Sequence, residues 1–312
     1  MPPGHVPSPL AKLGVAVARL GRRDLPMSVA ATPGPARVST WTRARGNPAI
    51  IAGSIICLIL VIMALFAPWI APYDPNKQML GTQLADPSRA HWLGLDSFGR
   101  DVFSRIIWGA RISLWVGVVA TLIAMFAGSA IGIVAGYFGG AVDRVISGLT
   151  DILLSFPQLV MGLLLVAVLG ASIGNIILAI AITAVPAFVR LARGSTLAMR
   201  ERDFIDAGRA LGFSDMRIMF AHVAPNILDE IIVMGSLWLA TAIRTESTLA
   251  FIGLGVPPPT ATWGGIIREG FEYLNDNYLL AVFPSLAILI TMIGLNLIGD
   301  GLRDATDPRA PQ

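Results

Sequence analysis

Long uncharged apolar runs alternate with short charged segments along this chain. The first run extends from about Ala49 to Ile70 and contains no Asp, Glu, Lys or Arg. About 20 apolar residues are enough for a helix to cross the hydrocarbon core of a bilayer. Ile112 to Val142 is also uncharged, and so are the 38 residues from Ile152 to Val189, which have room for two spans separated by Gly170 to Asn175. These runs predict the first four transmembrane helices.

Two more apolar runs, from about Ile231 to Gly253 and from Tyr278 to Gly299, complete a prediction of six transmembrane helices. The sequence therefore predicts an all-α membrane protein whose bundle occupies residues 48–302. Ala71 to Arg111 and Gly255 to Asn277 are expected to be outer segments. A hydrophobic content of 54%, a charged content of 14% and a mean hydropathy of +0.69 exclude a soluble domain of this size.

The two ends are expected to lie in the cytosol. Residues 1–47 carry seven Lys or Arg against one Asp, which predicts a mostly disordered tail that stays inside. Residues 303–312 are expected to be a second cytosolic tail, because six spans return the chain to its starting side. We expect no cleaved signal peptide, since the first apolar run begins late and has full membrane length.

Glycines and prolines suggest how the spans pack. Gly128, Gly132 and Gly136 are four residues apart, which gives one helix face a row of small residues that another helix can approach closely. Pro157 and Pro186 are expected to kink their helices, because proline lacks the N–H that the helical ladder requires. Both features indicate packing and imply no chemistry.

Several charged residues precede the second span. Asp96 or Ser97 is predicted to cap a short helix with an apolar face. Asp96 and Asp101 could also form a carboxylate pair or half of a metal site, but capping is favoured because no third ligand stands nearby. The apolar face of this short helix comprises Val102, Phe103, Ile106, Ile107 and Ala110.

The strongest charged interruption, Ser195 to Asn226, predicts two short amphipathic helices separated by Gly212. The first has its apolar positions at Phe204, Ala207, Gly208 and Leu211. The second begins at the N-cap Ser214, ends at Pro225 and has its apolar positions at Met216, Met219, Phe220 and Val223. Helices this short are marginal alone in water. Their apolar faces must either fold back on the membrane domain and its lipid interface or dock into a groove on a soluble partner.

The fifth span contains two charges, Arg244 and Glu246. Charged side chains inside a span are costly and normally face a bundle interior or a watery cavity. Because the two residues are two apart, they should point to different faces of the helix and find separate partners. Glu246 is a candidate for lining a transport pathway, and a salt bridge near the outer interface is the structural alternative.

The sequence contains no motif typical of a catalytic, cofactor or metal site. It has no GxxxxGK[ST] or HExxH pattern, and its single cysteine and three histidines form no ligand cluster. We therefore expect no enzymatic activity and no cofactor or metal bound by this chain. The net charge of +3 gives no indication of nucleic-acid binding. Active transport would need either an ion gradient or a separate ATPase.

The charged interruption resembles the EAA loop of ABC importer permeases. That loop reads Glu-Ala-Ala, three residues, Gly, nine residues, then Ile-x-Leu-Pro. Here the matching positions are held by Asp206, Ala207 and Gly208, then Gly212, and finally His222, Ala224 and Pro225. The spacing is kept, while Asp replaces Glu, Gly replaces the second Ala, and His and Ala replace Ile and Leu.

Four separated blocks make the resemblance more specific. They are HWLGLDSFGRDVFSRIIWGARISL from His91, DILLSFP from Asp151, HVAPN from His222 and TESTLAFIGLGVPPPTATWG from Thr245. Together they resemble the C-type permease of the dipeptide, oligopeptide and nickel importer family over Ala49 to Leu302. This implies a type I ABC importer permease-like bundle in a prokaryotic plasma (inner) membrane.

The resemblance also implies partners and a substrate class. The partners are a B-type permease, two cytosolic ATP-binding subunits that hold ATP and Mg²⁺, and an extracytoplasmic substrate-binding protein. Di- or oligopeptides are the expected substrates, with nickel or another small solute as the alternative. An ion-coupled secondary carrier would need several carboxylates near the membrane midplane, and the only candidates in this chain are Glu246 and Asp151. A passive scaffold or channel would leave the two-helix loop without a role.

Overall fold

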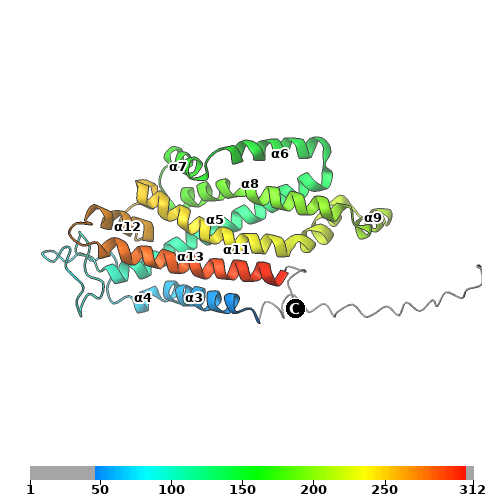
Figure 1. Ribbon diagram of the computed structural model, residues 1–312. Coiled ribbons are helices and arrows are strands. Elements are labelled where there is room, and N and C mark those ends of the chain that lie inside the picture. The colour runs from blue at the N-terminus through cyan, green and yellow to red at the C-terminus, as the bar shows by residue number, and fades with distance from the viewer. Residues whose placement is uncertain (1–45, 307–312) are drawn as a thin grey trace, which may run out of the picture. The chain divides into compact units, whose positions relative to one another are not determined.

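The structure is a computed structural model that describes residues 46–306, and helices account for its regular secondary structure (Figure 1). The predicted tails 1–47 and 303–312 lie largely outside the described residues. In chain order the helices are α3 Pro48–Leu65, α4 Ala67–Ile70, α5 Val102–Phe138, α6 Gly140–Ser155, α7 Gln158–Leu169, α8 Ile173–Arg200, α9 Asp203–Ala210, α10 Asp215–Arg217, the π-helix η1 Ile218–Val223, α11 Ala224–Leu249, the π-helix η2 Ala250–Leu254, α12 Trp263–Glu272 and α13 Leu279–Thr306.

Five helical segments in the described range are long and apolar enough to cross a membrane, and a bent pair brings the number to as many as six. The bent pair is α6 and α7, which meet at an angle of 92°. Phe156, between them, has extended backbone because the proline that follows it disfavours helical conformation. Pro157, predicted to kink a helix, therefore lies at a break between two helices, whereas Pro186 lies inside α8. The polar turn at Gly170 separates α7 from α8 as expected.

α5 begins ten residues earlier than the predicted span, at Val102, and runs without interruption for 37 residues. The prediction that Asp96 or Ser97 caps a separate short helix is wrong, because Asp101 is the N-cap. The Asp101 carboxylate accepts hydrogen bonds from the Ser104 amide at 2.8 Å and from the Ser104 hydroxyl at 2.7 Å. Among residues 46–306 no group of three acidic, His or Cys side chains could hold a metal.

The predicted glycine row on α5 packs against α8. A Cβ atom added to Gly128 would lie 2.6 Å from the Cβ of Phe188, and one added to Gly132 would lie 2.5 Å from the carbonyl oxygen of Val189. A Cβ atom added to Gly136 would lie 2.7 Å from the carbonyl oxygen of Arg193. The backbones are close enough to exclude any side chain, which confirms the predicted role of the row.

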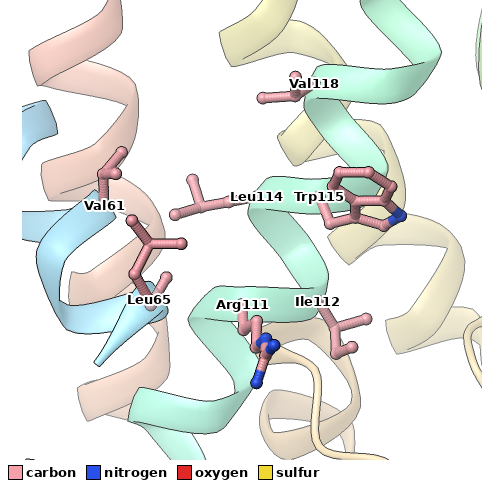
Figure 2. A pocket seen from close by; sticks show the side chains of 8 residues that line it. Val61, Leu65, Arg111, Ile112, Leu114, Trp115 and Val118 are labelled. Atoms are coloured by element: carbon pink, nitrogen blue, oxygen red, sulfur yellow. The ribbon is translucent and has the colours of Figure 1, made fainter. Parts of the chain in front are cut away.

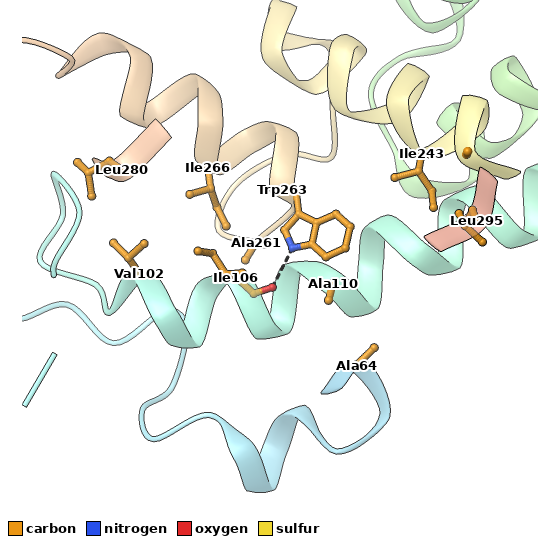
Figure 3. Close-up of a cluster of buried hydrophobic side chains, with 11 residues drawn as sticks. Ala64, Val102, Ile106, Ala110, Ile243, Ala261, Trp263, Ile266, Leu280 and Leu295 are labelled. Carbon is orange, nitrogen blue, oxygen red and sulfur yellow. Dashed lines mark hydrogen bonds between the residues drawn. The ribbon is translucent and has the colours of Figure 1, made fainter. Parts of the chain in front are cut away.

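A buried cluster attaches α12 to the start of α5 (Figure 3). Trp263 is fully buried, and its indole Nε1 donates a hydrogen bond to the Ile106 carbonyl at 3.0 Å. Buried Trp residues usually need such a partner for the N–H. The cluster consists of Ala64, Val102, Ile106, Ala110, Ala240, Ile243, Ala261, Trp263, Ile266, Leu280 and Leu295.

An apolar groove of about 530 Å³ lies between α3 and α5 (Figure 2). Its lining residues are Val61, Ala64, Leu65, Arg111, Ile112, Leu114, Trp115 and Val118. Along α3 many large apolar side chains are exposed, among them Ile55, Leu58 and Ile59. Such surfaces are stable against lipid tails, so this face fits a bilayer without further covering by this chain.

Candidate functional site

The charged interruption forms the predicted helix, glycine break and second helix. α9 ends at Ala210, and Gly212 adopts a φ of +77°, a left-handed conformation that glycine enters without strain. Ser214 is the N-cap of α10, and its side chain accepts a hydrogen bond from the Arg217 amide. We call residues 201–223 the coupling segment, after the role that the resemblance to the EAA loop implies. The segment starts at residue 201 because α8 continues to Arg200 and so includes Ser195.

The second half of the coupling segment does not stop at Pro225. Asp215 to Leu254 is one helical segment of 40 residues, so the predicted boundary between a loop helix and a span starting at Ile231 is wrong. The backbone is wound more loosely just before the proline, where the Ala224 N–H donates to the Met219 carbonyl five residues back. Pro225 follows this wide turn directly, as the second residue of α11, and the looser winding accommodates its ring and its missing N–H.

The apolar side chains of the coupling segment are divided between two faces. One face packs against Ile133, Tyr137 and Ala192 of α5 and α8. It is formed by Ile205, Gly208, Ile218, Met219 and Val223, which are all buried. The other face is open, with exposed fractions of 44% for Phe204, 74% for Leu211, 63% for Met216 and 45% for Phe220.

This division corrects the two predicted stripes in part. Met219 is buried in the chain's own core, whereas Met216 and Phe220, placed on the same stripe, are exposed. Ile205 and Ile218 were missed, because the predicted stripes followed the neighbouring apolar positions. Their signal was present in the sequence as a second apolar row, offset by one residue from the first.

Tyr137 at the end of α5 holds the coupling segment in place. Its hydroxyl donates to the Asp215 carboxylate at 2.7 Å, and its carbonyl accepts from the Arg200 guanidinium at 3.1 Å. Arg209 lies over the Tyr137 ring at 5.4 Å. Asp206 is exposed and meets Arg209 at 3.4 Å, a surface contact of small energetic weight.

An aromatic stack closes the bend between the two halves of the coupling segment. The rings of Phe213 and His222 are parallel within 8° at 5.5 Å, and the Arg217 guanidinium lies 4.1 Å from the centre of the Phe213 ring. Gly208 faces the same ring, so a Cβ at this position would lie 3.3 Å from it. Glycine at position 208 therefore lets α9 close on Phe213.

Ion pairs connect α6 to α8 near the same end of the bundle. Asp143 lies in the first turn of α6 and forms a bidentate pair with Arg193. Asp151, the second carboxylate considered for an ion-coupled carrier, pairs with Arg190 at 2.8 Å, and both side chains are exposed.

Glu246 is fully buried. Its Oε2 accepts hydrogen bonds from Ser113 Oγ at 3.1 Å and Ser247 Oγ at 3.3 Å, while Oε1 has no partner among the described residues. Arg244 is exposed on another face, as the two-residue spacing predicts. Within residues 46–306 no cation lies within 4 Å of Glu246, so the predicted alternative of a salt bridge does not occur there.

Comparison with known families identifies the chain. Residues 128–311 match the model of the binding-protein-dependent transport system inner membrane component, and residues 38–87 match the N-terminal TM domain of oligopeptide transport permease C. The chain belongs to this permease family. The resemblance to C-type permeases of ABC importers is confirmed.

Relatives and a solved structure agree with the assignment. The chain is 39% identical over 270 residues to the glutathione transport system permease protein GsiD of Pectobacterium atrosepticum, covering 86% of this chain and 90% of that protein. It is 41% identical over 266 residues to the probable D,D-dipeptide transport system permease protein DdpC of Escherichia coli, covering 85% and 89%.

The MetNI methionine ABC transporter in an inward-facing conformation supplies a solved structure of the same fold. The match has a TM-score of 0.53 at 18% identity and covers 66% of this chain and 98% of that one. The permease is thus a multi-pass inner membrane protein with the type I ABC importer permease fold.

Proposed function

We propose that this chain is the C-type permease subunit of an ATP-driven importer of di- or oligopeptides, including modified peptides such as glutathione. The names of its relatives support this substrate class, since one is a glutathione permease and another a probable D,D-dipeptide permease. A nickel or other small-solute importer is the alternative within the same family.

The observation that carries the coupling proposal is the open apolar face of the coupling segment. Phe204, Leu211, Met216 and Phe220 are exposed beside a face that is already packed on the chain's own core. An apolar ridge on short helices fits a groove on another protein. We assign this ridge to a cytosolic ATP-binding subunit that holds ATP and Mg²⁺, with Asp206, Ala207, Gly208 and Gly212 shaping the contact.

Motion would pass along the continuous helical segment. Asp215 to Leu254 joins the coupling segment to the opposite end of the bundle without a break in helical structure before Gly253. Closure of the two ATP-binding subunits would push on Met216 and Phe220 and tilt this segment as a rod, because spanning helices cannot unwind where no water satisfies their backbone. Glu246 would then lie close to the pathway formed with the partner permease.

The complete importer would contain a B-type permease, two ATP-binding subunits and an extracytoplasmic binding protein. In this arrangement both termini and the coupling segment lie in the cytosol, and α12 lies on the outer side. This chain would itself bind no cofactor, and lipid would cover the exposed face of α3.

Affinity purification of the tagged chain from its native membrane tests the proposal. We expect ATP-binding subunits to copurify, and the reconstituted complex with its binding protein to take up labelled dipeptide only when ATP is supplied inside. Uptake that proceeds without ATP and follows an ion gradient would contradict the proposal and favour a secondary carrier. Uptake of nickel in place of peptide would support the alternative substrate.

A further inference from the structure

A second cavity, of about 550 Å³, lies beside α12 and the loop that precedes it. We call it the α12 pocket. Its lining includes Arg100, Arg105, Glu269, Arg268 and Glu272. Its volume lies within the range of about 300–1,000 Å³ that is usual for small-molecule sites.

The floor of the α12 pocket carries charges that neutralise one another. The Arg100 guanidinium donates to Asp96 at 2.7 Å and to Glu269 at 2.6 Å. Arg105 donates to Glu269 at 3.1 Å and lies 3.4 Å from Asp96. Burial raises the pKa of Glu269 above its ordinary value, while the two arginines pull that pKa down. Two cations are balanced by two carboxylates, so the floor is rigid and has no charge to offer a ligand.

The rim of the pocket carries one uncompensated charge of each sign. Arg268 and Glu272 are four residues apart on α12, and both are exposed. Among the described residues neither forms an ion pair within 4 Å. Gly253 makes room for the Arg268 guanidinium, since a Cβ at position 253 would lie 2.6 Å from its Nη1.

We propose that the α12 pocket is a binding site for a short zwitterionic peptide, with Arg268 binding its carboxylate and Glu272 its ammonium group. This inference rests on the proposed function, because it assumes that peptides reach this end of the permease. Residues four apart on a helix have Cβ atoms about 5–6 Å apart. The charged ends of an extended dipeptide are separated by about 7 Å, at roughly 3.3–3.6 Å per residue. The spacing of the two charges therefore suits a peptide with both termini free.

The rest of the lining fits the same ligand. Phe98, Val256 and Pro257 offer apolar surface to peptide side chains, and Thr260 offers a hydroxyl. Charge-assisted hydrogen bonds to the two termini would supply the orientation. The permease would in this way add a selection step for free termini after the binding protein has released its peptide.

Direct binding to the full importer, purified through this chain and studied without its binding protein, tests the proposal. The probes are labelled L-Ala-L-Ala, its C-terminal amide and its N-acetyl derivative. We expect the free dipeptide to bind and each blocked derivative to bind about tenfold more weakly or worse. Arg268→Gln should weaken dipeptide binding about tenfold and remove the discrimination against the amide. Glu272→Gln should do the same for the N-acetyl derivative.

Two further variants complete the design. Arg89→Gln removes an exposed arginine that does not line the pocket and should leave binding unchanged. Ala171→Trp fills the pocket while keeping both charges and should abolish binding. Equal binding of free and blocked peptides, or no effect of either rim variant, would overturn the inference. A rim variant that weakens only the affinity for the binding protein would also overturn it, by assigning the charges to protein docking.

Failure of this site is distinguishable from failure of the proposed function. If the wild-type importer takes up peptide with ATP but binds none in these assays, the α12 pocket is not a peptide site and the permease assignment stands. If no ATP-dependent peptide uptake occurs at all, the proposed function itself is wrong.

Discussion

The Ser113 hydroxyl on α5 donates a hydrogen bond to the buried Glu246 carboxylate on α11, with an Oγ–Oε2 distance of 3.1 Å. The same Ser113 oxygen accepts a hydrogen bond from the backbone N–H of Trp263, the first residue of α12, at 3.3 Å. One hydroxyl thus joins three helices. Because the carboxylate has no cation nearby within the described part of the chain, hydrogen bonds alone stabilise it in the bundle.

Substitution of Glu246 should separate the contribution of hydrogen bonding from that of charge. Glu246→Gln keeps an acceptor for Ser113 and should change the free energy of unfolding by less than about 1 kcal/mol. Glu246→Ala removes the acceptor and leaves a cavity, so it should cost about 2–4 kcal/mol. Thermal unfolding of the purified permease in nanodiscs measures both. If glutamine were as damaging as alanine, the charge of Glu246, and not its hydrogen bonds, would be what stabilises the bundle.

The contact between α5 and α8 should tolerate no side chain at Gly132. Gly132→Ala places a methyl group against the Val189 carbonyl and should destabilise the permease by about 1–3 kcal/mol. Gly194→Ala is the matched control, since a Cβ at this exposed position of α8 meets nothing within 4 Å. The control should be neutral or stabilise by up to about 1 kcal/mol. Equal melting temperatures for the two variants would contradict the close packing.

The two faces of the coupling segment should respond differently to truncation. Met219→Ala removes a buried side chain and should lower permease stability by about 2–5 kcal/mol. Phe220→Ala removes an exposed one and should change stability by no more than about 0.5 kcal/mol, while weakening ATPase-subunit binding about tenfold. Thermal melts and quantitative copurification separate these effects. Unchanged copurification of Phe220→Ala would argue against docking at this face.

The turn at Gly212 should be essential for coupling. Its φ of +77° is closed to proline, and its N–H donates to the Arg209 carbonyl at 2.9 Å. Gly212→Pro should therefore abolish ATP-driven uptake while the protein still inserts into the membrane. The measurement is ATPase stimulation by the substrate-loaded binding protein in proteoliposomes, where normal stimulation would contradict a coupling role.

Charge reversal at Asp206 should give a similar loss without disturbing the fold. The side chain is exposed and its pairing with Arg209 is long, so Asp206→Lys should melt within a few degrees of wild type. Coupled uptake should fall at least tenfold, since the change lies at the proposed ATPase contact. Asp203→Lys, on the same helix and also exposed, is the matched control and should reduce coupled uptake less than Asp206→Lys does.

Local features of the chain predicted much of this architecture. The apolar runs located five of the six predicted spans, while the third predicted span is the bent pair of α6 and α7. The Gly128 row predicted the contact of α5 with α8, and Gly212 marked the bend in the coupling segment. Each of these features depends on backbone geometry or on the cost of burying charge, and residues close together in the sequence determine both.

Other features depend on contacts between residues far apart in the chain. α5 could begin at Val102, despite the charge of Arg105, because Glu269 neutralises that arginine. Glu269 lies more than 160 positions further along the chain, so local patterns could not show this contact. Pro225 did not end its helix because a wide turn preceded it. Residues 201–223 contain two apolar rows, and contact with Ile133 and Tyr137 on α5 decides which of the two is buried.

The helix that runs from Asp215 to the break at Gly253 gives the permease a rigid connection with both ends on one piece of backbone. At about 1.5 Å per residue the 38 residues before Gly253 measure roughly 57 Å, so a pivot of about 5° near the middle would displace each tip by about 2.5 Å. Met216 lies near one end of this helix, and Ala250, which lines the α12 pocket, lies near the other end. A push by an ATP-binding subunit on Met216 would therefore change the shape of the α12 pocket, with no relay of side chains in between.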